Sequence, residues 1–139
     1  MKRKKNINKA LHLKYKKLKN LKKELHYKTV NYMVSNYSRI INPSFMTQDM
    51  IKKLPSKTAR LINSLSYYEY KLILRRKCKE YDIDLIEKDE HYTSKTCNNC
   101  GKLNGKLGSK KIFECLGCKM IMKRDYVGAR GIMLKNNNW

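Results

Sequence analysis

Acidic side chains are scarce in this sequence. Only 11 Asp and Glu residues accompany 33 Lys and Arg residues among 139, which gives a formal net charge of +22. A compact chain with such a surplus repels itself unless a polyanion neutralises it. Nucleic acid is the expected partner, because each neutralised phosphate releases counterions. An anionic membrane surface is the alternative that composition leaves open.

Long apolar segments are also absent. No run of 18 apolar residues occurs, which excludes a membrane-spanning helix. The basic N-terminus is not followed by an uncharged apolar segment, so it is not typical of a signal peptide. With 41% apolar residues the chain can form one modest core. We expect an intracellular, nucleic-acid-associated protein, in the cytoplasm or nucleoid, or in the nucleus or a viral factory if the source is eukaryotic or viral.

Basic residues are concentrated at the start of the chain. Residues 2–28 hold 12 Lys or Arg and a single acid, Glu24. Apolar residues recur there at spacings of three, four and seven positions, which predicts an amphipathic helix that continues through Val34. These residues are Ile7, Leu11, Leu18, Leu21 and Leu25. Lysines cover the opposite face, and we interpret them as phosphate contacts because so many like charges destabilise an isolated helix. A solvated charged face is the simpler alternative.

The rest of the chain predicts alternating helices and strands. Strands are expected at 37–41, stopped by Asn42-Pro43, and at roughly 83–88. Ser56 and Ser66 are candidate helix N-caps, and Ser66 with Glu69 has the spacing of a capping box before a helix at 67–81. A final helix is expected at 125–135. Two strands separated by helices indicate a parallel pair in an α/β sheet, although two strands alone leave its edges unprotected.

Five cysteines are present, and four of them form two C-x-x-C pairs. Cys97 and Cys100 are separated from Cys115 and Cys118 by 14 residues. Each C-x-x-C turn can deliver two thiolates to one tetrahedral ion, so the pattern predicts a zinc ribbon. A closed set of four thiolates leaves no open coordination position, which makes the expected Zn²⁺ structural. A redox C-x-x-C or a chance pairing is the alternative, and the lone Cys78 is expected to be a core residue.

Three stretches carry a resemblance to a known family. They are EHYTSKTCNNCG at Glu90 to Gly101, FECLGC at Phe113 to Cys118, and KRDYVGARGIMLK at Lys123 to Lys135. Together they resemble the C-terminal region of the TnpB (OrfB-type) transposon-encoded RNA-guided nucleases and their Fanzor relatives. Upstream, LHYKTVNYMVSNY at Leu25 to Tyr37 is more weakly similar.

That resemblance implies a fold class and a domain division. The expected fold is an incomplete RNase H-like (RuvC-type) α/β domain with a long basic N-terminal helix and an inserted four-cysteine zinc ribbon. The implied division is 1–91 for the helix and partial α/β region, 92–122 for the ribbon, and 123–139 for the terminal helix.

The same resemblance implies candidate catalytic carboxylates. In the family, three carboxylates hold two Mg²⁺ ions for phosphodiester cleavage. Asp125 matches the last of them, and Glu90 matches the position that a subset of the family uses for the middle one. The more usual middle position holds no acid here, since 42–45 are uncharged. The simpler alternatives are an N-terminal helix residue for Asp125 and a solvated strand end for Glu90.

The counterpart of the first catalytic Asp is not found in the chain. The resemblance therefore implies a C-terminal fragment of an RNA-guided DNA endonuclease that does not cleave by itself. Its implied partners are DNA, a guide RNA and a separately encoded N-terminal portion, with no membrane. Two other classes stay open, namely a zinc-ribbon nucleic-acid-binding module without chemistry and a structural protein that binds folded RNA.

Overall fold

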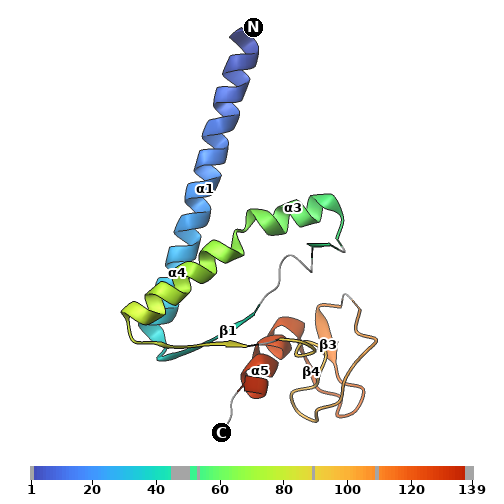
Figure 1. The fold of residues 1–139 in the computed structure, drawn as a ribbon. Helices are drawn as coiled ribbons and strands as arrows, with labels where there is room; N and C mark the ends of the chain where they lie inside the picture. Colours follow the sequence, from blue (N-terminus) through green and yellow to red (C-terminus); the bar gives the residue numbers. More distant parts are fainter. Residues whose placement is uncertain (1, 45–50, 53, 89, 109, 137–139) are drawn as a thin grey trace. The chain divides into compact units, whose positions relative to one another are not determined.

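The computed structural model describes residues 2–44, 51, 52, 54–88, 90–108 and 110–136 (Figure 1). The elements in chain order are α1 (Lys2–Asn36), β1 (Arg39–Pro43), α3 (Ser56–Ser64), α4 (Tyr67–Glu80), β2 (Asp84–Lys88), β3 (Ile112–Glu114), β4 (Ile121–Lys123) and α5 (Arg124–Asn136). They group into two compact units, residues 1–40 with 46–84, and residues 41–45 with 85–139. Among the helices described, none has both the length and the apolar composition that crossing a bilayer requires.

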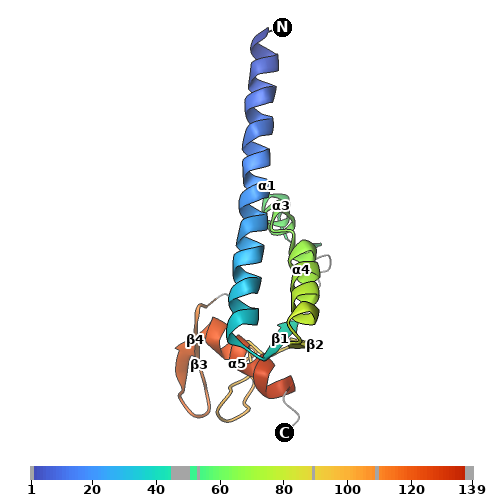
Figure 2. The ribbon, with the colours of Figure 1, turned by 90° about the vertical axis from the view of Figure 1, so that its left-hand side faces the viewer.

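The first unit is built on the pairing of α1 with α4. Figure 2 shows α4 running beside the C-terminal half of α1, while the N-terminal half of α1 extends beyond it. The two helices bury Val30 and Val34 of α1 and Leu74 and Cys78 of α4. Cys78 is 2% exposed, which confirms the prediction that it is a core residue.

The start of α4 is held by α1 and not by a capping box. Ser66 is the N-cap residue, as expected, but it adopts a left-handed conformation with φ of 52° and its hydroxyl caps no backbone N–H. Instead, Lys22 Nζ donates to Ser66 Oγ at 2.9 Å, and His26 Nε2 lies 3.0 Å from the carbonyl oxygen of Leu65. The capping-box prediction was therefore wrong, since the hydroxyl oxygen accepts from Lys22 of the neighbouring helix and not from a backbone N–H of α4. The prediction that Ser56 is an N-cap was also wrong, because Ser56 is the first helical residue of α3 and Pro55 is its N-cap.

The predicted amphipathic face of α1 is also different from expectation. We expected Ile7 to Leu25 and Val30 to Val34 to continue one apolar face. The structure buries His26, Val30 and Val34, but the five predicted apolar residues between 7 and 25 are all at least 48% exposed. An α-helix turns by about 100° per residue, so these two sets of residues point in directions about a third of a turn apart. Thus α1 has two apolar faces, and α4 covers only one of them.

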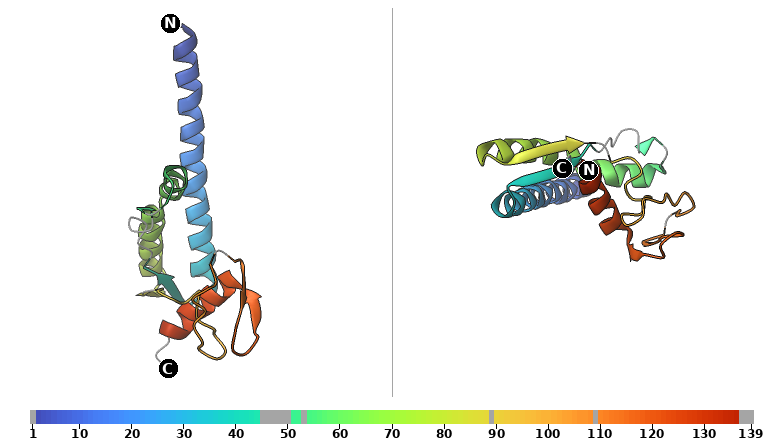
Figure 3. Two further views of the ribbon diagram at one scale, coloured as in Figure 1. Left: turned by 90° about the vertical axis from the view of Figure 1, so that its right-hand side faces the viewer. Right: turned by 90° about the horizontal axis from the view of Figure 1, so that it is seen from below.

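The strands β1 and β2 form a two-stranded sheet, visible in Figure 3. The N–H of Asp84 donates to the carbonyl of Ser38 at 3.1 Å, and the N–H of Ser44 donates to the carbonyl of Lys88 at 2.8 Å. Bonds that join start to start and end to end identify a parallel pair, as predicted. Strand β1 runs through Pro43 and not only to position 41, which is tolerated because a strand's terminal residue can lack a ladder N–H.

The second unit has a small core between a hairpin and α5. Strands β3 and β4 are antiparallel, with Phe113 opposite Met122. The buried cluster is Cys97, Leu107, Phe113, Cys115 and Val127, with Met120 and Met122 packed against it. We predicted β3 from Ile112-Phe113, whereas β4 was not predicted, because three residues are too few for an alternating pattern.

A candidate metal centre

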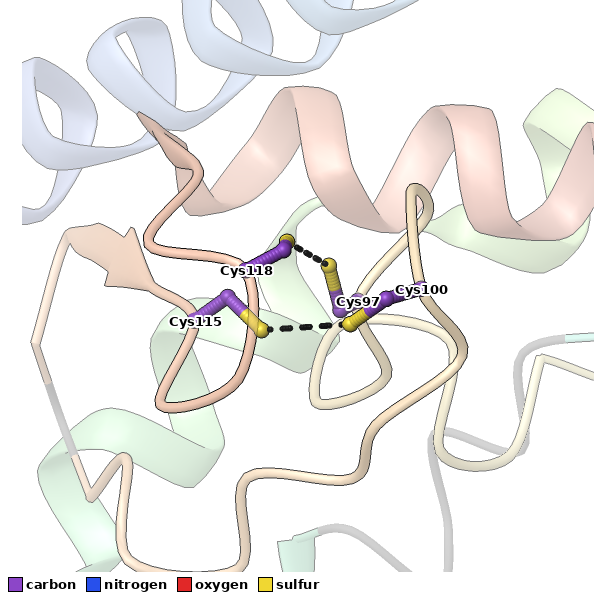
Figure 4. Close-up of side chains that lie close together, drawn as sticks. All are labelled: Cys97, Cys100, Cys115 and Cys118. Atoms are coloured by element: carbon purple, nitrogen blue, oxygen red, sulfur yellow. Dashed lines mark hydrogen bonds between the residues drawn. The ribbon is translucent and has the colours of Figure 1, made fainter.

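The four paired cysteines converge on one point (Figure 4). The Sγ atoms of Cys97 and Cys118 are 3.6 Å apart, and those of Cys100 and Cys115 are 3.5 Å apart. All four sulfur atoms lie within 4.8 Å of one another. A tetrahedral ion with zinc–sulfur bonds of about 2.3 Å requires sulfur–sulfur distances of about 3.8 Å. The donor set and its spacing therefore fit a four-thiolate metal site.

The two cysteine turns have the same backbone design. The N–H of Gly101 donates to the carbonyl of Cys97, and the N–H of Lys119 donates to the carbonyl of Cys115. Each turn is closed by a second bond at 2.9 Å, from Cys97 N–H to Lys102 and from Cys115 N–H to Met120. The residue after each second cysteine has positive φ, 73° at Gly101 and 61° at Lys119. A lysine thus holds a conformation that glycine adopts without strain.

A second glycine, Gly117, lies beside the sulfur atoms. A Cβ added at Gly117 would lie 3.0 Å from Cδ of Lys102 and 3.5 Å from Sγ of Cys100. The N–H of Gly117 donates to Sγ of Cys115 at 3.3 Å. A methyl group at Gly117 would therefore need a small shift of the exposed Lys102 side chain and would make ordinary contact with the sulfur atoms.

The protein environment favours thiolate at two of the four cysteines. The backbone N–H of Met120, and after it the side chain of Asn99, lowers the pKa of Cys118 to about 6. The pKa of Cys115 is also lowered, first by the backbone N–H of Cys118. At Cys100 the backbone N–H of Lys102 lowers the pKa, but the Cys115 thiol and burial outweigh it and raise the pKa to about 11. A bound divalent cation would stabilise the thiolate form of every ligand.

Helix α5 is joined directly to the first cysteine turn. Nδ2 of Asn98, which lies between Cys97 and Cys100, donates to the carbonyl of Val127 at 2.8 Å. A Cβ added at Gly131 would lie only 2.8 Å from the carbonyl oxygen of Thr93 and 3.2 Å from Oδ1 of Asn98. Sequence reasoning assigned no role to Asn98, Gly131 or Lys119. Superposing the two C-x-x-C-x segments would have identified Lys119 as the counterpart of Gly101.

The two predicted carboxylates have different surroundings. Glu90 follows β2, is partly buried, and its carbonyl accepts hydrogen bonds from the N–H and the hydroxyl of Thr93. Asp125 lies in the first turn of α5 and is exposed. Over the described part of the chain, the four cysteines are the one group of three or more potential ligands that converges, and it includes neither carboxylate. The structure therefore assembles the predicted cysteine site, and the roles of Glu90 and Asp125 stay predictions.

The other prominent chemical feature is the cationic surface of α1. Every residue from 6 to 20 is exposed, including the five lysines Lys9, Lys14, Lys16, Lys17 and Lys19. Glu24 is the single acid in the helix and pairs with Lys28 at 2.7 Å. The Lys28 side chain lowers the pKa of Glu24, and Glu24 raises the pKa of Lys28. The remaining lysines of α1 have no acid of their own helix to neutralise them.

Comparison with known proteins identifies the family. Residues 67–132 match the family described as Cas12f1-like, TNB domain. The chain is 35% identical over 121 residues to a putative transposase of Paramecium bursaria Chlorella virus 1, which covers 87% of the chain and 28% of that relative. It is 32% identical over 136 residues to a TnpB-like protein of Acanthamoeba polyphaga mimivirus, covering 95% of the chain and 26% of that relative.

A more distant relative is a CRISPR-associated endodeoxyribonuclease, Cas12f1, of Sulfoacidibacillus thermotolerans. It is 32% identical over 79 residues, which are 56% of the chain and 19% of that protein. The chain spans only about a quarter of the length of the viral relatives. The transposase-like relatives, the matching family and the converging cysteines agree with the motifs of the sequence, and the chain belongs to the TnpB-like family.

Proposed function

We propose that this chain is the zinc-containing, DNA-binding C-terminal part of a TnpB-type RNA-guided DNA endonuclease, and that it does not cleave DNA by itself. The observation that carries the proposal is the exposed lysine surface of α1, with a single acid in 35 residues. Lysines without acidic partners bind phosphates with release of counterions. The names of the relatives support the same class of activity, since one is called a putative RNA-guided DNA endonuclease.

The metal in this proposal is Zn²⁺ with a structural role. Four sulfur ligands within 4.8 Å of one another match the ligand type and geometry that zinc prefers. Because all four positions are protein thiolates, no site is left for water or substrate. The ion would join the two cysteine turns and, through Asn98 and Val127, fix the first turn of α5 against them.

Cleavage would need a second kind of metal site. Two Mg²⁺ ions, when bound by three carboxylates, activate the attacking water and stabilise the leaving oxygen. We assign Glu90 and Asp125 as descendants of such carboxylates in an RNase H-like sheet of which β1 and β2 are a part. Among the described residues, these two carboxylates belong to no larger group of converging ligands and so fit a two-ion site poorly, and no cleavage step is assigned to this chain.

The missing functions are proposed to come from partners. The viral relatives are about four times as long as the stretch they share with this chain. We propose that a separately encoded portion supplies the first carboxylate and holds the guide RNA. The viral sources of the relatives favour a nucleic-acid-rich compartment such as a nucleoid or viral factory.

A salt titration tests the DNA-binding proposal. Fluorescence anisotropy on a labelled duplex should give a steep loss of affinity with salt, with log K falling by about 0.9 per contacted phosphate for each unit of log salt. Replacing Lys16, Lys19 and Lys23 by Gln together should reduce that slope by roughly 2–3, because these lysines share one side of α1. The matched control replaces the exposed Lys57, Lys79 and Lys88, which lie on three other elements.

Three outcomes would contradict the proposal. A slope near zero for the native chain would exclude phosphate contact, and an equal change in the control triple would exclude α1 as its location. Efficient cleavage of plasmid DNA by the purified chain with Mg²⁺, lost in Asp125→Ala, would exclude the non-cleaving assignment. We expect Glu90→Ala and Asp125→Ala to bind the duplex within about twofold of the native chain.

A further inference from the structure

Helix α1 carries a second apolar face that no described element covers. Its members are about half exposed or more, between 48% and 61% for the six large side chains. They are Ile7, Leu11, Leu18, Leu21, Leu25 and Tyr32; we call them the α1 stripe. The face that α4 covers contains the buried Val30. It also contains His26, which contacts Leu65 and Tyr70, and Met33, which contacts Tyr70. The stripe is therefore separate from the helix pair that forms the first unit.

The spacing of the stripe is that of a coiled-coil seam. Starting at Ile7, the positions advance by four and three alternately through 11, 14, 18, 21, 25, 28 and 32. Such a 3.5-residue repeat keeps one narrow line of side chains in contact with a second helix over the whole length. At 1.5 Å per residue the stripe is about 38 Å long. A membrane-surface helix usually has a broader apolar face, whereas this stripe is bordered by lysines.

The repeat has eight positions, of which six are the α1 stripe and two are Lys14 and Lys28. These two lysines determine the charge that a partner must carry. Lys28 already pairs with Glu24 at 2.7 Å. Lys14 has Ala10, Leu11, Lys17 and Leu18 as its neighbours on the helix and therefore no acid within reach along α1. Covering Lys14 with an apolar surface would leave a buried charge unpaired, which is costly. The complementary surface must place a carboxylate opposite Lys14.

A second copy of this chain does not meet that requirement. In a parallel pair Lys14 would face Lys14, and in a fully overlapping antiparallel pair it would face Leu25, whose neighbour Glu24 already pairs with Lys28. Both arrangements bring like charges together in a helix with 12 basic residues among positions 2–28. Among the described helices of this chain, α3 has no acidic residue, while α4 and α5 have too few to line a seam.

We propose that the α1 stripe docks an acidic amphipathic helix of a different protein. Apolar residues of that helix pack between Leu11 and Leu25, and its carboxylates pair with Lys14 and with the lysines at the border of the stripe. An α-helix turns by about 100° per residue, so Lys16, Lys19 and Lys23 lie on the side of α1 opposite the α1 stripe. They stay available for phosphate. One helix thus presents a protein-binding face and a nucleic-acid-binding face. This inference does not depend on the DNA-binding proposal.

The test uses the full zinc-loaded chain and a designed peptide. The labelled peptide has Leu at the seam positions, Glu at the flanking positions and Glu opposite Lys14; a scrambled peptide has the same composition. We expect anisotropy at 0.3 M NaCl to show saturable binding of the designed peptide only. Leu18→Gln should weaken it by tenfold or more, while Leu13→Gln, an equally exposed leucine (56%) outside the stripe, should change it by less than twofold.

A charge exchange keeps the proposal testable if Leu18→Gln fails to fold. Lys14→Glu should weaken the designed peptide and favour a peptide with Lys at the facing position, which loss of folding cannot produce. Equal binding of the scrambled peptide, or equal effects of Leu13→Gln and Leu18→Gln, would overturn the proposal. Self-association of the chain that Leu18→Gln abolishes would also overturn the proposal. The same holds for binding to vesicles with 30% phosphatidylserine that depends on Leu18 and occurs in place of peptide binding.

Discussion

The first unit of this chain, the helical unit, and the second, the ribbon unit, are stabilised by different means. The helical unit buries a few residues between α1 and α4 and leaves much of a 35-residue helix uncovered. The ribbon unit has strands of three residues and gathers its short segments around four cysteines and Phe113. A long helix can thus present a large charged surface with little core of its own, whereas strands this short gather around a four-cysteine site that fits a metal ion.

The largest difference between the two units is expected when the metal is removed, which should unfold the ribbon unit and leave the helical unit folded. We expect chelation, or Cys97→Ser, to unfold residues 90–136, because structural zinc sites contribute about 10–16 kcal/mol of apparent binding free energy. Hydrogen exchange should lose protection in that region and keep it in α1 and α4. Cys78→Ala serves as the control and should retain one metal ion per chain by elemental analysis. Protection of the ribbon in the metal-free chain would refute the dependence.

A substitution in the helical core should have the opposite effect and destabilise the helical unit while the ribbon unit keeps its metal. Leu74 is fully buried, so Leu74→Ala should lower the free energy of unfolding of the helical unit by about 2–5 kcal/mol. Urea denaturation followed by helical circular dichroism measures the change, and the metal content should stay at one ion. Leu72→Ala removes the same atoms from a side chain that is 45% exposed and should cost much less. Equal losses in the two variants would contradict the assigned core.

Two glycines of α5, in the ribbon unit, should have opposite effects on stability when each is replaced by Ala. Gly131→Ala places a methyl group 2.8 Å from the carbonyl oxygen of Thr93, and we expect a loss of about 1–3 kcal/mol in the stability of the metal-loaded ribbon. Gly128→Ala meets only Ser94 Cβ at 3.5 Å, so the helix propensity of Ala should stabilise α5 by up to about 1 kcal/mol. Thermal unfolding should move in opposite directions for the two variants. The same sign for both would show that the approach to Thr93 is not restrictive.

The smallest expected effect is a gain at Lys119. Its φ of 61° is unfavourable for a residue with a Cβ, so Lys119→Gly should stabilise the ribbon by about 0.5–1 kcal/mol after the entropy of glycine is counted. Chemical denaturation of the metal-loaded chain measures it. Lys102→Gly, at a ribbon position without positive φ, should not stabilise. If Lys119→Gly were destabilising, the lysine side chain itself would have to contribute to the second cysteine turn.

Local patterns predicted most of the elements and the metal ligands. The 3.6-residue periodicity identified α1, α4 and α5. The observed ends of α4 and α5 differ from the expected ones by no more than two residues. The spacing of Cys97, Cys100, Cys115 and Cys118 identified the metal site because each C-x-x-C turn is a local structure. Strand β4 was not predicted because its three residues are too few to show an alternating pattern. The partner of the Ser66 hydroxyl was not predicted because Lys22 is distant in the chain.

The sequence alone determined the positive charge, the helix-forming segments, the cysteine pairs and the family motifs, because each is a property of composition or of near neighbours. Only the tertiary structure decided which face of α1 is covered, that Lys22 occupies the hydroxyl of Ser66, and that Gly131 must approach Thr93. The physical reason is that helical periodicity marks apolar residues without saying which neighbour will bury them. Burial is a property of two surfaces, and α4 supplies a surface for only one side of α1.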